Sequence, residues 1–175
     1  MSRVAVSVFG LDRPGIVAAV TRALAEAGGN LEDSSMTILR GHFAMMLLVA
    51  APNGAGLVEH VLAPVARELD LQVSVRPLDD EVTSALPSGE RWVLAVYGAD
   101  RPGLVARVAE VLAAHGANIT DLESRVIGEP EPVYAMHFEV ELPGAEVDAI
   151  QAELRAVAAE LEVEISTHPD DADVL

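Results

Sequence analysis

Apolar and polar positions along the chain alternate between two periods, which predicts short strands separated by amphipathic helices. Val4, Val6 and Val8 alternate with smaller or polar residues, the period-two pattern of a strand with one buried face. Strand-like stretches near residues 30–40 and 42–50 follow, and Leu71–Val75 forms a last one. Between the strands, apolar residues recur at helical spacing: Val17, Val20, Leu24 and Ala27, then Leu57, Val61, Val65 and Leu69.

The chain repeats this pattern once. Residues 10–33 and 98–121 are identical at roughly half of their positions, at a constant offset of 88 residues. Beyond them the offset grows by about three residues, because the second copy has an insertion in the turn-forming segment 128–132. The second copy has strand-like stretches at Trp92–Tyr97, 118–127, 133–142 and Val163–Ile165, and helical stripes of Val105, Val108, Val111 and Leu112 and of Val147, Ile150, Leu154, Val157 and Leu161.

Each copy therefore has the order β-α-β-β-α-β. The economical packing of this order is a four-stranded antiparallel sheet with two helices on one face, the ferredoxin-like fold of the α+β class. We expect the first domain over residues 1–77 and the second over 91–167, joined by a polar linker at 78–90. Residues 168–175 are predicted to be an acidic tail that frays. The other face of each sheet is then either covered by another part of the protein or exposed to solvent.

Composition and charge exclude several classes of function. With 11 basic and 28 acidic residues the net charge is −17, which argues against direct binding to nucleic acid. The chain has no cysteine, so disulfides, thiolate metal sites and cysteine nucleophiles are excluded. No apolar run approaches the ~18 residues of a membrane span, and the N-terminus lacks a signal-peptide pattern. We therefore expect a cytoplasmic protein that does not bind a membrane.

The sequence also lacks the motifs of common enzymes. It has no Gly-x-Ser-x-Gly elbow, no phosphate-binding loop and no dinucleotide fingerprint. Four methionines are interpreted as filling core or interface space: Met36, Met45, Met46 and Met136. We expect neither an enzymatic activity nor a cofactor or bound metal. The histidines, which have no metal-ligand spacing and are interpreted as structural, are His42, His60, His115, His137 and His168.

One motif occurs in both copies where the first strand leads into the first helix. It reads Gly-x-Asp-Arg-Pro-Gly-[Ile/Leu]-Val and covers Gly10–Val17 and Gly98–Val105. A second motif, Gly-x-Asn-[Leu/Ile], follows the first helix at Gly28–Leu31 and Gly116–Ile119. Proline suits the first turn of a helix, and glycine suits its C-terminal end. The two motifs therefore frame the first helix of each copy.

The first motif is suited to an amino-acid zwitterion. The first N–H groups of a helix lack intrahelical acceptors and carry the positive end of the dipole, so they suit a carboxylate. Gly15 and Gly103 let a ligand approach the backbone, and Asp12 and Asp100 are placed to accept hydrogen bonds from its ammonium group. The alternative is that the two aspartates only cap their helices.

The element order and the duplicated motifs resemble the ACT domain. The double arrangement is similar to the stand-alone proteins of the glycine cleavage system transcriptional repressor family, and the resemblance covers nearly the whole chain. It implies a regulatory protein that binds a small amino acid such as glycine or serine where domains meet, and that acts on a protein partner. It also implies that Asn30 and Asn118 face the ligand from a neighbouring domain; alternatively, they satisfy a helix C-terminus.

The sequence thus predicts an amino-acid sensor that acts through protein–protein contacts. Its alternatives are a regulatory subunit of an amino-acid biosynthetic enzyme and a ligand-free assembly module. The two copies pair within one chain or between chains, and we favour a homodimer. For Arg13 and Arg101, exposure or pairing with nearby acids is the alternative to a ligand role. The candidate ligand-binding residues are Asp12, Arg13, Pro14, Gly15, Ile16, Asn30 and Leu31, with Asp100, Arg101, Pro102, Gly103, Leu104, Asn118 and Ile119.

Overall fold

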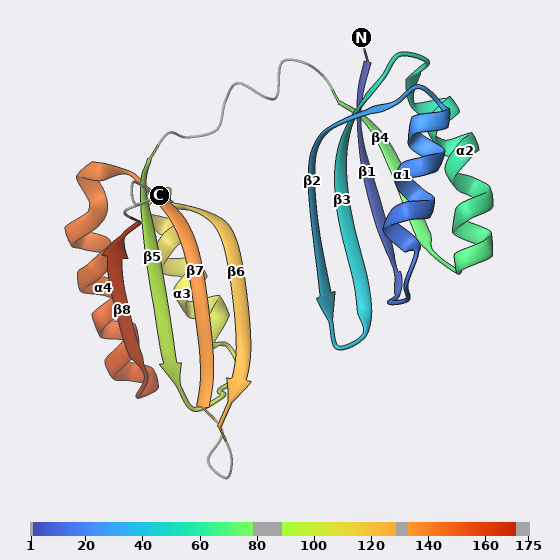
Figure 1. The fold of residues 1–175 in the computed structure, drawn as a ribbon. Helices are drawn as coiled ribbons and strands as arrows, with labels where there is room; N and C mark the ends of the chain where they lie inside the picture. Colours follow the sequence, from blue (N-terminus) through green and yellow to red (C-terminus); the bar gives the residue numbers. More distant parts are fainter. Residues whose placement is uncertain (1, 79–88, 129–132, 171–175) are drawn as a thin grey trace. The chain divides into compact units, whose positions relative to one another are not determined.

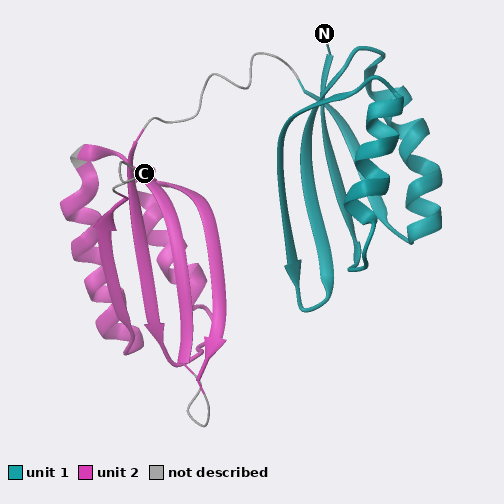
Figure 2. Ribbon diagram, viewed as in Figure 1, with its two compact units in different colours: residues 1–85 teal, residues 86–175 magenta. Residues whose placement is uncertain are grey.

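The computed structural model describes residues 2–78, 89–128 and 133–170, which form two compact units, residues 1–85 and 86–175 (Figures 1 and 2). The elements of unit 1 are β1 (Ser2–Leu11), α1 (Ile16–Glu26), β2 (Asn30–Leu39), β3 (His42–Ala51), α2 (Gly54–Leu69) and β4 (Gln72–Leu78). Those of unit 2 are β5 (Glu90–Gly98), α3 (Leu104–Ala114), β6 (Asn118–Ile127), β7 (Val133–Leu142), the 3-10 turn η2 (Gly144–Glu146), α4 (Val147–Leu161) and β8 (Glu164–Pro169).

Each unit is a four-stranded antiparallel sheet with both helices on one face (Figure 1). The strand orders are β2-β3-β1-β4 and β6-β7-β5-β8, so the first strand of each copy is central. Both sheets carry a register shift at the same point, between Leu31 and Asp33 and between Ile119 and Asp121. The predicted α+β, ferredoxin-like fold is confirmed for both copies.

The core of each unit lies between the sheet and its two helices. Val4, Val6 and Val8 all point into it and are almost fully buried, as their alternation predicts. The predicted stripe of the first helix is partly wrong, because Val17 is 39% exposed while Ile16 is buried. In α2 the buried residues are Val58 and Leu62, and the predicted stripe lies beside them. The predicted stripe of α4 is correct, since Ile150, Leu154 and Val157 are buried.

The last strand of each copy extends further than the alternation indicates. β4 runs to Leu78, and β8 runs to Pro169 because residues 167–169 pair with 92–94 of β5. Polar residues pair there because only one face of the sheet is covered, so the exposed positions tolerate polar side chains. Residues 79–88 of the predicted linker and 171–175 of the predicted tail lie outside the described residues.

Gly10 and Gly98 lie at the C-terminal ends of β1 and β5, where the chain passes close to the residues that precede the last strand of each unit. A Cβ on Gly10 would lie 2.6 Å from Leu71 Cδ2, and one on Gly98 would lie 2.5 Å from Val163 Cγ1. These distances are too short for carbon atoms in contact. The first glycine of the duplicated motif is therefore required for packing, a role that the sequence alone did not suggest.

Substituting Gly10→Ala should destabilise unit 1 by about 1–3 kcal/mol, because the added methyl group forces Leu71 or the strand end to move. Thermal unfolding followed by circular dichroism measures the effect. Gly56→Ala is the matched control, since a Cβ there meets nothing within 4 Å and alanine favours the helix. Equal stability of the two variants would contradict the packing role of Gly10.

His115 joins the two helices of unit 2. Its side chain is 15% exposed at the C-terminal end of α3, with Nδ1 2.9 Å from Glu146 Oε2 and Nε2 3.1 Å from Glu153 Oε1. Both ring nitrogens can donate only when the imidazole is protonated. The hydrogen bond to Glu146, followed by that to Glu153, raises the pKa of His115 above its usual value. This histidine is structural, as predicted, but it is sensitive to pH.

The stability of unit 2 should therefore fall as the pH rises. Because the folded-state pKa of His115 is raised, its contribution is complete below its unfolded pKa of about 6.5 and is lost as the pH passes through the folded value. Fluorescence of Trp92, the single tryptophan, reports the unfolding of unit 2. His115→Ala should flatten the pH dependence of the unfolding midpoint; a profile unchanged from that of the parent protein would refute the assignment.

Candidate functional site

The turn that precedes the first helix has the same geometry in both units. Gly15 and Gly103 are the N-caps of α1 and α3, with φ of 98° and 90° in the left-handed region. A Cβ on either glycine would meet nothing within 4 Å, so the turns lie open to the outside. Neither helix has a side-chain cap among the residues described. The first N–H groups of each helix are therefore available to an external acceptor, at the positive end of the helix dipole.

The aspartates of the motif do not cap these helices, so that alternative is wrong for both. Asp12 and Asp100 are exposed, and each lies three residues before the glycine that occupies the N-cap. The Asp12 N–H donates to the carbonyl oxygen of Gly41, 2.8 Å away at the tip of the β2–β3 hairpin. This backbone contact fixes the start of the turn and leaves the Asp12 carboxylate in solvent.

The two arginines differ between the units. Arg101 Nη2 forms an ion pair with Glu162, which confirms the pairing alternative for this residue. Arg13 is exposed and has no ion pair with any residue in the described ranges. The Leu104 N–H donates weakly to the carbonyl of Arg101, at 3.2 Å, which occupies one donor of the α3 turn.

Ile16 and Leu104 do not present their side chains to a ligand. Each is 1% exposed and belongs to the core of its unit. Leu31 and Ile119 are partly buried and pack against the same cores. These four positions were predicted from their place in the motifs, but apolar residues next to a turn also serve to anchor it. Their contribution at the site is restricted to the backbone.

The structure does not bring the asparagines to the turn of their own unit. Asn30 pairs with Ala50, whereas the end of β1 at Leu11 pairs with His42. Eight residues of β3 separate these positions, which corresponds to roughly 26 Å at 3.3 Å per residue. Asn118 pairs with Glu141 and is separated from the corresponding strand end by a similar length of β7. One unit thus holds the aspartate and the asparagine at opposite ends of its sheet.

Nor do the asparagines satisfy a helix C-terminus. They are the first residues of β2 and β6, and their side chains form no hydrogen bond with the described residues. The ends of α1 and α3 are satisfied by backbone bonds, from Gly29 N–H to Leu24 O and from Ala117 N–H to Leu112 O, both 2.9 Å. The amide groups of Asn30 and Asn118 are therefore available to another molecule.

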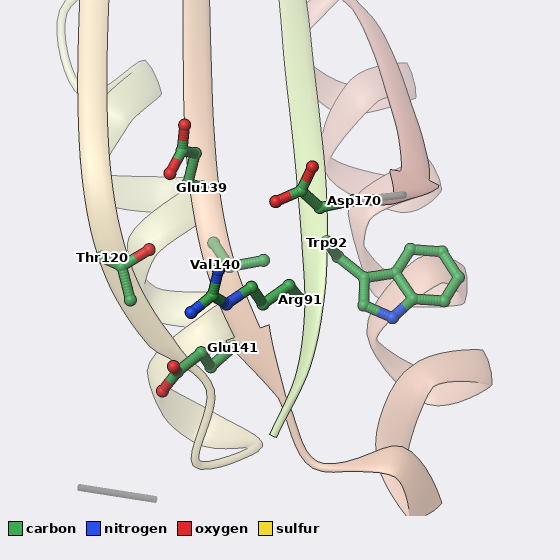
Figure 3. A pocket seen from close by; sticks show the side chains of 7 residues that line it. All are labelled: Arg91, Trp92, Thr120, Glu139, Val140, Glu141 and Asp170. Carbon is green, nitrogen blue, oxygen red and sulfur yellow. The ribbon is translucent and has the colours of Figure 1, made fainter. Parts of the chain in front are cut away.

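Two shallow hollows lie on the open faces of the sheets, away from these turns. The hollow of unit 2 has a volume of about 200 Å³ and is mostly polar. Figure 3 shows Arg91 between Thr120 and Glu141, with Glu139 and Asp170 further along the face and the Trp92 ring pointing away. The hollow of unit 1 has a volume of about 300 Å³. Neither hollow is lined by a residue of the two motifs.

Within the described residues, no three acidic or histidine side chains gather in a group that could hold a metal ion. No helix in the same part of the chain combines the length and apolar character that crossing a membrane requires. The turns can bind a ligand by hydrogen bonding and charge. Their backbone N–H groups can donate to an anion, and the nearby aspartate carboxylate can accept from a cation.

The fold and the duplicated turns define a pair of ACT domains, and the chain belongs to the ACT domain family, whose model matches residues 2–76 and 90–168. Over 161 residues it is 33% identical to the glycine cleavage system transcriptional repressor of Escherichia coli (strain K12), an alignment that covers 89% of this chain and 84% of that protein. The resemblance inferred from the two motifs is therefore confirmed along most of the chain.

Other relatives extend the comparison. The crystal structure of an unknown protein from Galdieria sulphuraria is 31% identical, with a TM-score of 0.85 over 96% of this chain and 98% of that one. A putative glycine cleavage system transcriptional repressor, 20% identical with a TM-score of 0.74 and 96% of each chain covered, shares the fold. Phosphoserine phosphatase SerB2 of Mycobacterium tuberculosis is 29% identical over 93% of this chain but only 40% of that enzyme. The similarity to the enzyme is thus confined to part of its length.

Proposed function

We propose that this chain is a regulatory protein that binds a small amino acid at its ACT domains and transmits the signal through contacts with a protein partner. The observation that carries the proposal is the duplicated turn: an uncapped helix N-terminus behind an open glycine, with a solvent-exposed aspartate three residues before it. Both copies of the repeat within the chain have this arrangement.

The turn groups match the charges of an amino acid. The ligand carboxylate accepts hydrogen bonds from the first-turn N–H groups of α1 or α3 and lies at the positive end of the helix dipole. Its ammonium group donates to Asp12 or Asp100 in a charge-assisted hydrogen bond. Because the asparagine of the same unit lies at the far end of the sheet, an amide contact to the ligand requires a second ACT domain.

Glycine and serine are the first ligands to test. The name of the Escherichia coli relative refers to glycine cleavage, and small side chains suit a turn that offers backbone donors rather than a deep apolar pocket. Binding would favour the conformation in which the ligand makes additional contacts with the protein. It would thereby increase the population of that conformation available to a protein partner. The net charge of −17 supports a protein partner, either a regulator or an enzyme, over direct contact with DNA.

The same reasoning leads us to propose a non-enzymatic cytoplasmic protein that needs no cofactor and is active as a homodimer. A ligand-free assembly module is the second candidate. It is favoured by the apolar side chains that remain exposed on edge strands β2 and β6, such as Met36, Ile38, Leu122 and Val126. In that case the oligomeric state, measured by light scattering, would be independent of any amino acid.

Isothermal titration calorimetry of the full chain against the common amino acids tests the leading proposal. We expect saturable heat with one or a few small amino acids and little with large ones. Light scattering on the same samples shows whether the ligand changes the assembly. If no amino acid binds, the sensor proposal is wrong, and ligand-independent dimerisation would then support the assembly module.

A further inference from the structure

The open face of the unit 1 sheet contains a depression that its strand register explains. Residues paired across antiparallel strands share a face, so the register arranges the open face in rows. One row runs from Asp33 through Leu48 and Ala5 to Arg76. The next row runs from Ser35 through Met46 and Ser7 to Ser74. Small side chains thus occupy β1 in both rows and β4 in the second, with Leu48 and Met46 beside them on β3 and Arg76 on β4.

This depression is the hollow of about 300 Å³ lined by Ala5, Val6, Ser7, Met46, Ser74 and Arg76. Ala5, Ser7 and Ser74 form its floor because their side chains are short. The Met46 side chain, 58% exposed, forms an apolar wall on one side, and Arg76 stands at the other edge on β4. The volume is at the lower end of the range for small-molecule sites.

Arg76 has no ion pair with any residue of the described ranges, although the chain has a net charge of −17. The other arginine on this face, Arg3, is paired with Glu32 at 2.8 Å. Besides Glu32, which is paired with Arg3, the only acid that the described strands of unit 1 place on the open face is Asp33. It lies three strands from Arg76, a separation of roughly 14 Å between backbones, too far for an ion pair.

The groups around the hollow are hydrogen-bond donors next to an apolar wall. A guanidinium group binds carboxylates and phosphates with two parallel hydrogen bonds, and the hydroxyls of Ser7 and Ser74 can donate two more. Met46 offers a soft surface for an apolar group. We propose that this hollow binds a small molecule that combines an oxyanion, either carboxylate or phosphate, with a short apolar group. It is a second ligand site, separate from the turns.

Unit 2 lacks the site at the corresponding positions. Its register places Ala95 where unit 1 has Ser7, and His168 where unit 1 has Arg76. Val93 replaces Ala5 and is only 7% exposed, so the floor of the depression is filled. The neighbouring residues Glu139 and Glu141 add negative charge to that face. The oxyanion site is therefore specific to unit 1, and unit 2 serves as an internal control.

Two-dimensional amide NMR of the full chain, titrated with benzoate, phenyl phosphate and acetate, tests the proposal. We expect saturable shifts at Ala5, Ser7, Met46, Ser74 and Arg76, with no equivalent shifts on unit 2. Benzoate or phenyl phosphate should bind more tightly than acetate, because only these two carry an apolar group. The tighter of the two identifies the oxyanion as carboxylate or phosphate.

Two variants distinguish binding at this hollow from a general effect of the protein's charge. Arg76→Gln should weaken binding of the tighter probe at least about tenfold, because one charged hydrogen-bonding partner is lost. Arg67→Gln is the matched control, since Arg67 is exposed on α2, on the covered side of the sheet. Equal effects of the two variants, absence of shifts around the hollow, or acetate binding as tightly as benzoate and phenyl phosphate would overturn the proposal. None of these outcomes bears on amino-acid binding at the turns, which does not use this face.

Discussion

Replacing both Asp12 and Asp100 by alanine should weaken amino-acid binding by about 10- to 100-fold, the loss expected for a hydrogen bond to a charged group. The thermal stability of the double variant should stay close to that of the parent protein. Neither aspartate caps its helix, and both side chains are exposed, so the fold does not depend on them. Calorimetric titration of the amino acid that binds the parent protein measures the loss of affinity.

The matched control removes two carboxylates elsewhere. Glu59→Ala combined with Glu164→Ala changes the net charge by the same amount, and both residues are exposed and lie outside the two motifs. This control variant should bind the amino acid as the parent protein does. If both double variants lose affinity equally, the aspartates act through the overall field of the protein, and their assignment to the ligand ammonium is wrong.

Phe138→Ala should have the largest effect on stability, a loss of about 3–5 kcal/mol in the unfolding of unit 2. Phe138 is fully buried in β7 and belongs to the core beneath α3 and α4. Removing its ring leaves a cavity that the surrounding side chains fill only in part. The midpoint of thermal unfolding, followed by Trp92 fluorescence, should fall by more than about 10 °C.

Tyr97→Ala is the control for this prediction, because Tyr97 is an aromatic residue of the same sheet but is 44% exposed on its open face. We expect a loss of about 1 kcal/mol or less. A similar destabilisation by both substitutions would mean that the open face of unit 2 is covered in solution, contrary to the arrangement of the core on one face only.

The fold was predictable because the repeat and the two periodicities agree. Strands at 118–127 and 133–142 were predicted with the bounds that β6 and β7 have, since glycine and proline mark the turn between them. The helical stripes were less accurate. Val17 and Ile16 are both apolar and adjacent, and only the packing of α1 on the sheet determines that Ile16 is buried. Periodicity alone does not fix the rotation of a helix when apolar residues occupy neighbouring positions.

The candidate site was predictable in part. The two motifs identified the open turns and their glycines, because positive φ and close approach of a ligand both favour glycine. They did not show that Asn30 lies at the opposite end of the sheet from Asp12, which depends on strand register. The hydrogen bond from the Asp12 N–H to Gly41 and the hollow beside Arg76 were also not predicted, since both involve residues that are far apart in the sequence.

The most direct test of the account is amide NMR of the full chain with the amino acid that calorimetry identifies. Binding at the turns predicts large shifts and slowed exchange for the first-turn N–H groups of Val17, Ala18, Val105 and Ala106, which have no partner within their helices. Shifts confined to the open sheet faces or to other parts of the two units, with these four amides unchanged, would contradict it.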